Sequence, residues 1–115
     1  MEGWILIARA IVAIAFLAIS STANAAQVIC FLEVDGQIYL QGRCTYVPDP
    51  NGSFSIGTDD PAGKYFAYLA TSAPNEATGF WNGTAGGTHA HEDLGKLHRN
   101  GGCWVNDTAK ICAWR

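Results

Sequence analysis

Residues that could ligate a metal gather in one short segment of this 115-residue chain. His89 and His91 are separated by one residue, and on an extended strand residues i and i+2 share a face, so both imidazoles could bind one ion. Glu92 or His98 could add a third ligand. The same spacing is common in loops whose imidazoles only make hydrogen bonds. We therefore expect no metal and no other cofactor, and we keep a metal-binding protein as an alternative.

Residues with the types and spacing for catalysis are hard to find. The carboxylate pairs Asp59-Asp60 and Glu92-Asp93 lie in polar segments with Gly and Pro nearby, where neighbouring acids are usually solvated. The sequence contains no G-x-S-x-G nucleophile motif. Seven Lys and Arg residues and a formal net charge of -3 leave no basic stripe for nucleic acid. We predict that the chain is not an enzyme and does not bind nucleic acid.

Four cysteines form the next group, and an even count in a short chain indicates two disulfides. No two of them have the C-x-x-C spacing that zinc favours, and three pairings are possible. A two-residue turn at 107–108 would place Cys103 opposite Cys112 on antiparallel strands, within disulfide distance. We therefore predict a Cys103–Cys112 bridge.

The remaining pair, Cys30–Cys44, follows by elimination. A hairpin turn at Asp35-Gly36 places Cys30 opposite Gln41 rather than opposite Cys44. This bridge therefore needs a bulge near Gly42 or a looser loop.

The N-terminus has the three parts of a secretory signal. Arg9 precedes an apolar run over 10–19, and Ala23-Asn24-Ala25 forms a small-x-small cleavage site. The run is too short for a transmembrane helix, which needs roughly 20 apolar residues. We predict a signal peptide over 1–25, a single β domain over 26–115, a periplasmic or secreted location and no membrane association after cleavage. An uncleaved amphipathic anchor is the alternative.

The mature part shows short apolar and aromatic runs separated by Gly, Pro, Asn and Asp, which is typical of an all-β domain. The segment 64–71 is apolar on both faces and is predicted to be a central strand. A small antiparallel β-barrel or sandwich with two disulfides would bury such strands and hide their edges. The other predicted strands cover 27–34, 37–47, 54–56, 77–82 and 94–98, with a closing hairpin over 102–114.

Two short motifs and the closing stretch from Cys103 to Trp114 resemble one known family. The motifs are Ala62-Gly63-Lys64-Tyr65 and Phe80-Trp81-Asn82-Gly83. They are similar to elements of the periplasmic and membrane-bound inhibitors of c-type lysozyme, in an alphaproteobacterial branch. Those inhibitors are exported antiparallel β-barrels with a Ser-Gly-x-x-Tyr-like loop and a Trp-x-Lys-Gly element. Ala62 stands where the family has Ser, and Asn82 stands where it has Lys.

The resemblance implies a protein partner, c-type lysozyme, and physical blockade of its cleft. That cleft holds two carboxylates, so Lys64 would make a charge-assisted bond there while Tyr65, next to Gly63, would fill an apolar sugar subsite. The family's hydroxyl would come from Ser53 or Ser55. The loop acids would face the basic rim of the enzyme and speed encounter, namely Asp59 and Asp60. An envelope interaction module is a further alternative, and the oligomeric state is left open.

Overall fold

The computed structural model describes residues 26–58 and 64–115, and this part of the chain contains eight strands and one short 3-10 helix. The helix is η1 (Pro50–Gly52). None of the described residues belongs to a helix that is long and apolar enough to span a membrane. The predicted signal peptide over 1–25 lies outside the described residues. The strands are β1 (Ala26–Val34), β2 (Gln37–Pro48), β3 (Phe54–Ile56), β4 (Ala67–Ala73), β5 (Glu76–Trp81), β6 (Glu92–Asn100), β7 (Cys103–Val105) and β8 (Ala109–Trp114).

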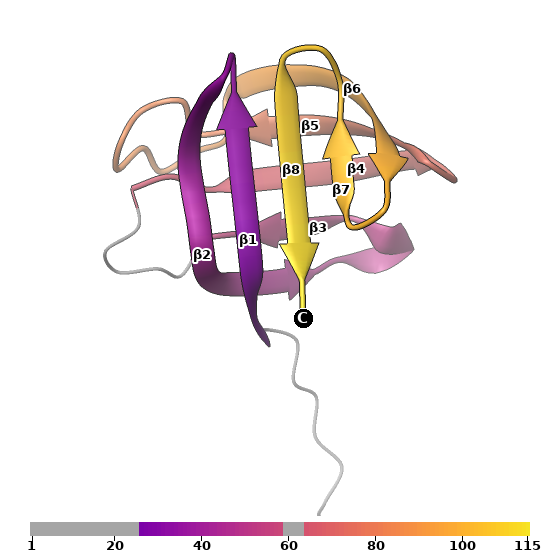
Figure 1. Ribbon diagram of the computed structural model, residues 1–115, viewed down its shortest axis with the longest axis horizontal. Helices are drawn as coiled ribbons and strands as arrows, with labels where there is room; N and C mark the ends of the chain where they lie inside the picture. The colour runs from indigo at the N-terminus through magenta and orange to yellow at the C-terminus, as the bar shows by residue number, and fades with distance from the viewer. Residues whose placement is uncertain (1–25, 59–63) are drawn as a thin grey trace, which may run out of the picture.

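The strands form a closed antiparallel barrel in chain order. Each strand pairs with the next, and β1 pairs with β8, from Ile29 opposite Trp114 to Val34 opposite Ala109. Figure 1 shows these two strands side by side on the near wall. The predicted all-β fold is confirmed, and of the two predicted architectures the structure has the β-barrel and not the β-sandwich. Closure pairs the two edges that an open sheet would expose.

Alternation along the strands fills the barrel. On β1, for example, Val28, Cys30, Leu32 and Val34 are buried while the residues between them are not. This period of two is what a strand with one wet face requires. The largest fully buried side chains come from five different strands: Leu32, Ile56, Leu69, Leu97, Ile111, and the half-cystines Cys30 and Cys112. All of them except Cys112 belong to one core.

Both predicted disulfides are present, with Cα atoms 5.9 Å apart for Cys30–Cys44 and 4.0 Å apart for Cys103–Cys112. The second bridge joins residues that face each other in the β7–β8 ladder, in the predicted register. No free cysteine occurs among the described residues. Two bridges of this kind indicate an oxidising compartment, such as the periplasm or the extracellular space.

A bulge aligns the first bridge, and it lies elsewhere than predicted. The β1–β2 register shifts between Leu32 and Glu33, which leaves Tyr39 as an extra residue on β2. The shift moves Cys30 from Gln41 to a position opposite Gly42. Cys30 then reaches Cys44 diagonally across the ladder, so a bulge is needed, but not at Gly42.

Two predicted strands need correction. The strand predicted over 64–71 begins only at Ala67, because the backbone of 64–66 bonds to a side chain described below. Tyr68 and Ala70 are half-buried rather than buried, since the outer face of a barrel strand meets solvent. The strand predicted over 94–98 extends over Glu92–Asn100.

Candidate functional site

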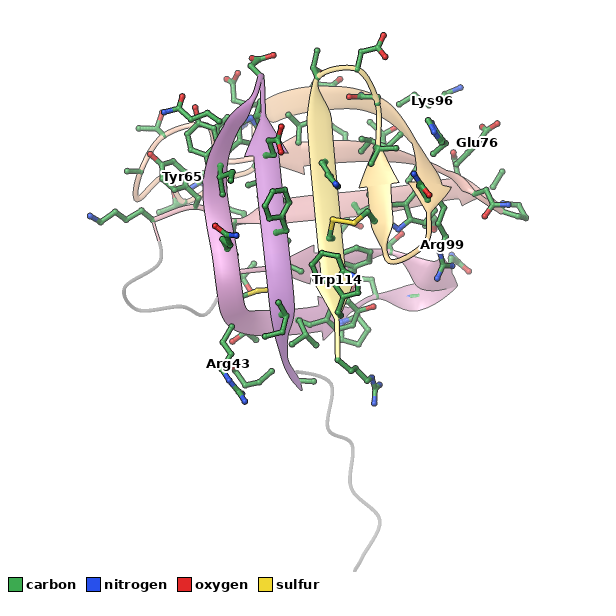
Figure 2. All side chains as sticks on the ribbon, in the orientation of Figure 1. Arg43, Tyr65, Glu76, Lys96, Arg99 and Trp114 are labelled. Carbon is green, nitrogen blue, oxygen red and sulfur yellow. A yellow bond between two sulfur atoms is a disulfide. The ribbon has the colours of Figure 1, made fainter. Side chains whose placement is uncertain are left out.

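The segment singled out by the sequence, Lys64-Tyr65, lies at one end of the barrel just before β4. Lys64 is exposed and Tyr65 is half-buried, and Figure 2 shows Tyr65 on the flank of the barrel beside β2. Gly63, Asp59 and Asp60, which were predicted to accompany them, lie outside the described residues. The described part of the candidate site therefore consists of Lys64, Tyr65 and what holds them.

An aromatic cluster supports Tyr65. Its ring centroid lies 4.9 Å from that of Tyr39 and 5.9 Å from that of Trp81. Tyr39 and Trp81 are themselves 4.5 Å apart, and the Tyr39 hydroxyl donates to Gln37 Oε1 at 3.1 Å. Contacts at these separations and tilts are favourable for aromatic pairs. Two rings, Tyr39 from β2 and Trp81 from β5, thus pack against Tyr65 and hold it in place.

Asn82, directly after β5, fixes the backbone of the same segment. Its Nδ2 donates to the carbonyl oxygens of Lys64 at 2.7 Å, Thr84 at 3.1 Å and Gly87 at 3.2 Å. Its Oδ1 accepts from Phe66 N at 3.1 Å. The side chain is 7% exposed, so these bonds are shielded from water. Asn82 therefore joins the segment 64–66 to the turn 84–87.

The two segments also bond directly. Gly86 N donates to the Lys64 carbonyl at 2.8 Å, and Asn82 N donates to the Phe66 carbonyl at 3.3 Å. Gly57, directly after β3, lies close to the backbone of Tyr65. A Cβ on Gly57 would lie 2.9 Å from the Tyr65 carbonyl oxygen. Gly57 also has a φ of +85°, which a side chain would disfavour. The backbone beside Lys64 is thus held from three directions.

The two predicted serines lie away from Lys64. Ser53 is buried, and its Oγ accepts from Thr71 N at 2.9 Å and lies 3.1 Å from Thr71 Oγ1. Thr71 follows Tyr65 by six positions along β4, which corresponds to roughly 20 Å of extended chain. Ser55 is half-buried on the outer face of β3, opposite Tyr68. The structure therefore does not bring a hydroxyl of either serine to Lys64.

The histidine pair forms part of the loop before β6. The ring centroids of His89 and His91 are 5.2 Å apart, and both residues are exposed. His98 lies farther along β6, opposite Glu76. Within residues 26–58 and 64–115, no group of three or more His, Cys, Asp or Glu side chains is placed to hold a metal ion.

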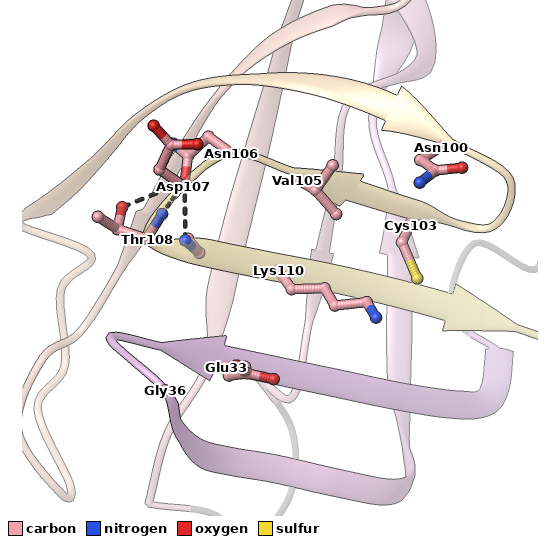
Figure 3. A pocket seen from close by; sticks show the side chains of 10 residues that line it. Glu33, Gly36, Asn100, Cys103, Val105, Asn106, Asp107, Thr108 and Lys110 are labelled. Carbon is pink, nitrogen blue, oxygen red and sulfur yellow. Dashed lines mark hydrogen bonds between the residues drawn. The ribbon is translucent and has the colours of Figure 1, made fainter.

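A separate hollow of about 400 Å³ lies on the outer wall over β8 (Figure 3). Glu33 from β1 and Lys110 from β8, which face each other in the ladder, line it together with the turn at Asp107. The side chain of Asn106 at its rim already makes hydrogen bonds within the protein, since its Oδ1 accepts from Thr108 N at 2.9 Å and Ala109 N at 2.7 Å. Its Nδ2 donates to two carbonyls of β6. The polar groups at this rim stabilise the hairpin.

Sequence reasoning did not identify Tyr39 or the role of Asn82. Asn82 was noted as a departure from a lysine, although an amide followed by a glycine at the end of a strand is a common loop-fixing residue. No local signal links Tyr39 to Tyr65, because the two meet only when the barrel closes. Comparisons with protein-family models, curated proteins and solved structures find no match to this chain.

Proposed function

We propose that this protein inhibits c-type lysozyme outside the cytoplasm by placing the Lys64-Tyr65 segment in the enzyme's cleft. The proposal starts from the resemblance in the two short motifs and the closing stretch. It is supported by an oxidised barrel that holds an exposed lysine at one end. The signal peptide over 1–25 belongs to the same proposal. N-terminal sequencing of the exported protein should give Ala26 as the first residue.

The observation that carries the proposal is the fixing of Lys64 by Asn82. A binding loop that is already ordered loses less conformational entropy when it meets its partner. Here the Lys64 carbonyl accepts from both Asn82 Nδ2 and Gly86 N, while the Lys64 side chain stays exposed. The neighbouring Tyr65 ring rests on two other rings. Such a loop is suited to enter a preformed cleft.

The chemistry follows from the two carboxylates of a lysozyme cleft. The Lys64 ammonium would form a charge-assisted bond with one of them, and Tyr65 would contact the apolar surface of a sugar subsite. Asp59 and Asp60 would face the basic rim. Ser53 is left out of the proposed contact surface because its hydroxyl is buried and bonded to Thr71. Ser55 is left out because it lies on the outer wall of β3.

A turbidity assay tests the proposal. Oxidised protein is mixed with c-type lysozyme and peptidoglycan, and the inhibition constant is compared for the unmodified protein, Lys64→Ala and the control Lys96→Ala. Lys96 is an exposed lysine on β6 whose only ion pair among the described residues is a 4.0 Å contact with Glu76. Lys64→Ala should weaken binding by about 2–5 kcal/mol, at least ~30-fold, because it leaves a buried carboxylate unpaired.

The control should leave the inhibition constant unchanged. The proposal fails if oxidised protein at micromolar excess leaves peptidoglycan cleavage unaffected. If inhibition occurs but Lys64→Ala equals Lys96→Ala, Lys64 is not part of the contact.

A further inference from the structure

A polar groove lies toward the far end of β4 from Lys64. It consists of two adjoining hollows of about 480 Å³ and 270 Å³ that share Gly52, Arg99 and Trp104. Figure 2 shows Arg99 on the side of the barrel away from Tyr65. We call this feature the end groove and define it by the residues used below: Tyr46, Asn51, Phe54, Asn75, Arg99 and Trp104.

Aromatic rings line one half of the end groove. Tyr46 and Phe54 stack with centroids 5.1 Å apart and planes 29° apart, and Trp104 belongs to both hollows. Trp104 is 8% exposed, so only part of its ring reaches the groove. Aromatic walls with a few fixed polar groups are typical of sites for small ligands.

Arg99 is the only charged residue that lines either hollow in the described part of the chain. Its Nε donates to the Gly101 carbonyl at 3.2 Å, and its guanidinium carbon lies 6.0 Å from the centre of the Trp104 ring. Its backbone N also bonds to the Asn75 carbonyl at 3.3 Å. These contacts orient the guanidinium while its two terminal nitrogens keep donors in the fork that suits a carboxylate. None of the described carboxylates pairs with it.

Amides border the guanidinium. Asn51 in η1 and Asn75 in the β4–β5 turn are exposed and have φ of 66° and 64°, which Asn tolerates better than most residues. Neither side-chain amide makes a hydrogen bond within residues 26–58 and 64–115. Each amide can donate and accept, which is what a ligand rich in hydroxyl groups requires.

We propose that the end groove binds a saccharide that carries a carboxylate. The carboxylate would pair with Arg99, the hydroxyl groups would bond to Asn51 and Asn75, and the apolar face of a sugar ring would rest on the aromatic wall. An extended peptide fits less well, because the closed barrel pairs its strands and leaves no open edge here for strand addition. This proposal does not depend on lysozyme inhibition, since the groove and Lys64 lie far apart on the barrel.

NMR titration of the oxidised protein tests it with an acid and its methyl ester, in which the carboxylate charge is removed. Digalacturonic acid should shift the amide signals of the end groove, and its methyl ester should bind at least ~10-fold more weakly, the usual loss when a charge-assisted bond becomes neutral. Arg99→Gln should weaken binding of the acid by a similar factor. The control Arg43→Gln removes an exposed arginine from β2, outside the groove, and should change nothing.

Three results would overturn the proposal. The first is no shift at the groove with about 20 mM acid, a concentration that would detect even a weak site. The second is equal affinity for acid and ester, and the third is equal affinity of Arg99→Gln and the unmodified protein. Should Arg99→Gln fail to fold, the comparison of acid with ester on the unmodified protein decides alone.

Discussion

Replacing Asn82 by alanine should cost the protein about 3–5 kcal/mol of its free energy of unfolding. The Asn82 amide carries two hydrogens and donates to three carbonyls, which amounts to about two full hydrogen bonds at about 1 kcal/mol each. Phe66 N loses its acceptor, and an unpaired buried donor costs about 1–3 kcal/mol more. A small domain has only about 5–15 kcal/mol in total, so the loss should be large.

Guanidinium chloride denaturation with both disulfides intact measures the effect. Asn100→Ala is the matched control, because Asn100 is exposed on β6 and makes no side-chain hydrogen bond within the described residues. Its stability should stay within about 0.5 kcal/mol of the unmodified protein. Asn82→Asp sharpens the test, since a carboxylate keeps the shape but cannot donate to carbonyls.

Asn82→Asp should therefore be at least as unstable as Asn82→Ala at neutral pH. An Asn82→Ala loss below about 1 kcal/mol would refute the assignment of Asn82 as the residue that fixes this end of the barrel. So would an Asp variant as stable as the unmodified protein.

Three further changes test the scaffold by the same denaturation. Replacing both cysteines of Cys103–Cys112 by alanine should cost roughly 3 kcal/mol, the chain entropy released when a loop of about ten residues is opened; an unchanged midpoint would contradict this. Gly79→Ala should cost about 1–3 kcal/mol, because its Cβ would lie 2.5 Å from Leu97 Cδ1; a stabilised variant would contradict this. Asn106→Ala should cost about 2–4 kcal/mol, because it removes bonds across the β7–β8 turn and to β6.

The parts of the fold that depend on near neighbours could be predicted from the sequence. The Cys103–Cys112 hairpin follows from one turn and the alternation beside it, so its register was correct. The Cys30–Cys44 pairing was correct, and of the two predicted ways to permit it, a bulge near Gly42 or a looser loop, the structure has a bulge, at Tyr39. A bulge depends on how the whole strand fits the barrel, which alternation in one hairpin does not specify.

The surroundings of the candidate site could not be predicted in this way. The Asn82 side chain donates to three carbonyls. The one most distant in the sequence, that of Lys64, lies next to Asn82 only because β4 pairs with β5. Ser53 was predicted, with Ser55 as the alternative, to supply beside Lys64 the hydroxyl that the family resemblance implies. The strand between them instead carries them apart, since β3 and β4 are antiparallel. Placement of this kind is set by tertiary packing rather than by residue type.

The order of the two bridges along the chain bears on how the protein matures. Each bridge joins consecutive cysteines, whose positions differ by 14 and 9, whereas the ladder between β1 and β8 joins the first strand to the last. When the chain emerges with its N-terminus first, the two thiols of each hairpin can therefore be oxidised as that hairpin appears. This can happen before the slow long-range ladder between β1 and β8 forms. An oxidase that links neighbouring thiols in turn would give the native pairing, without any need for an isomerase.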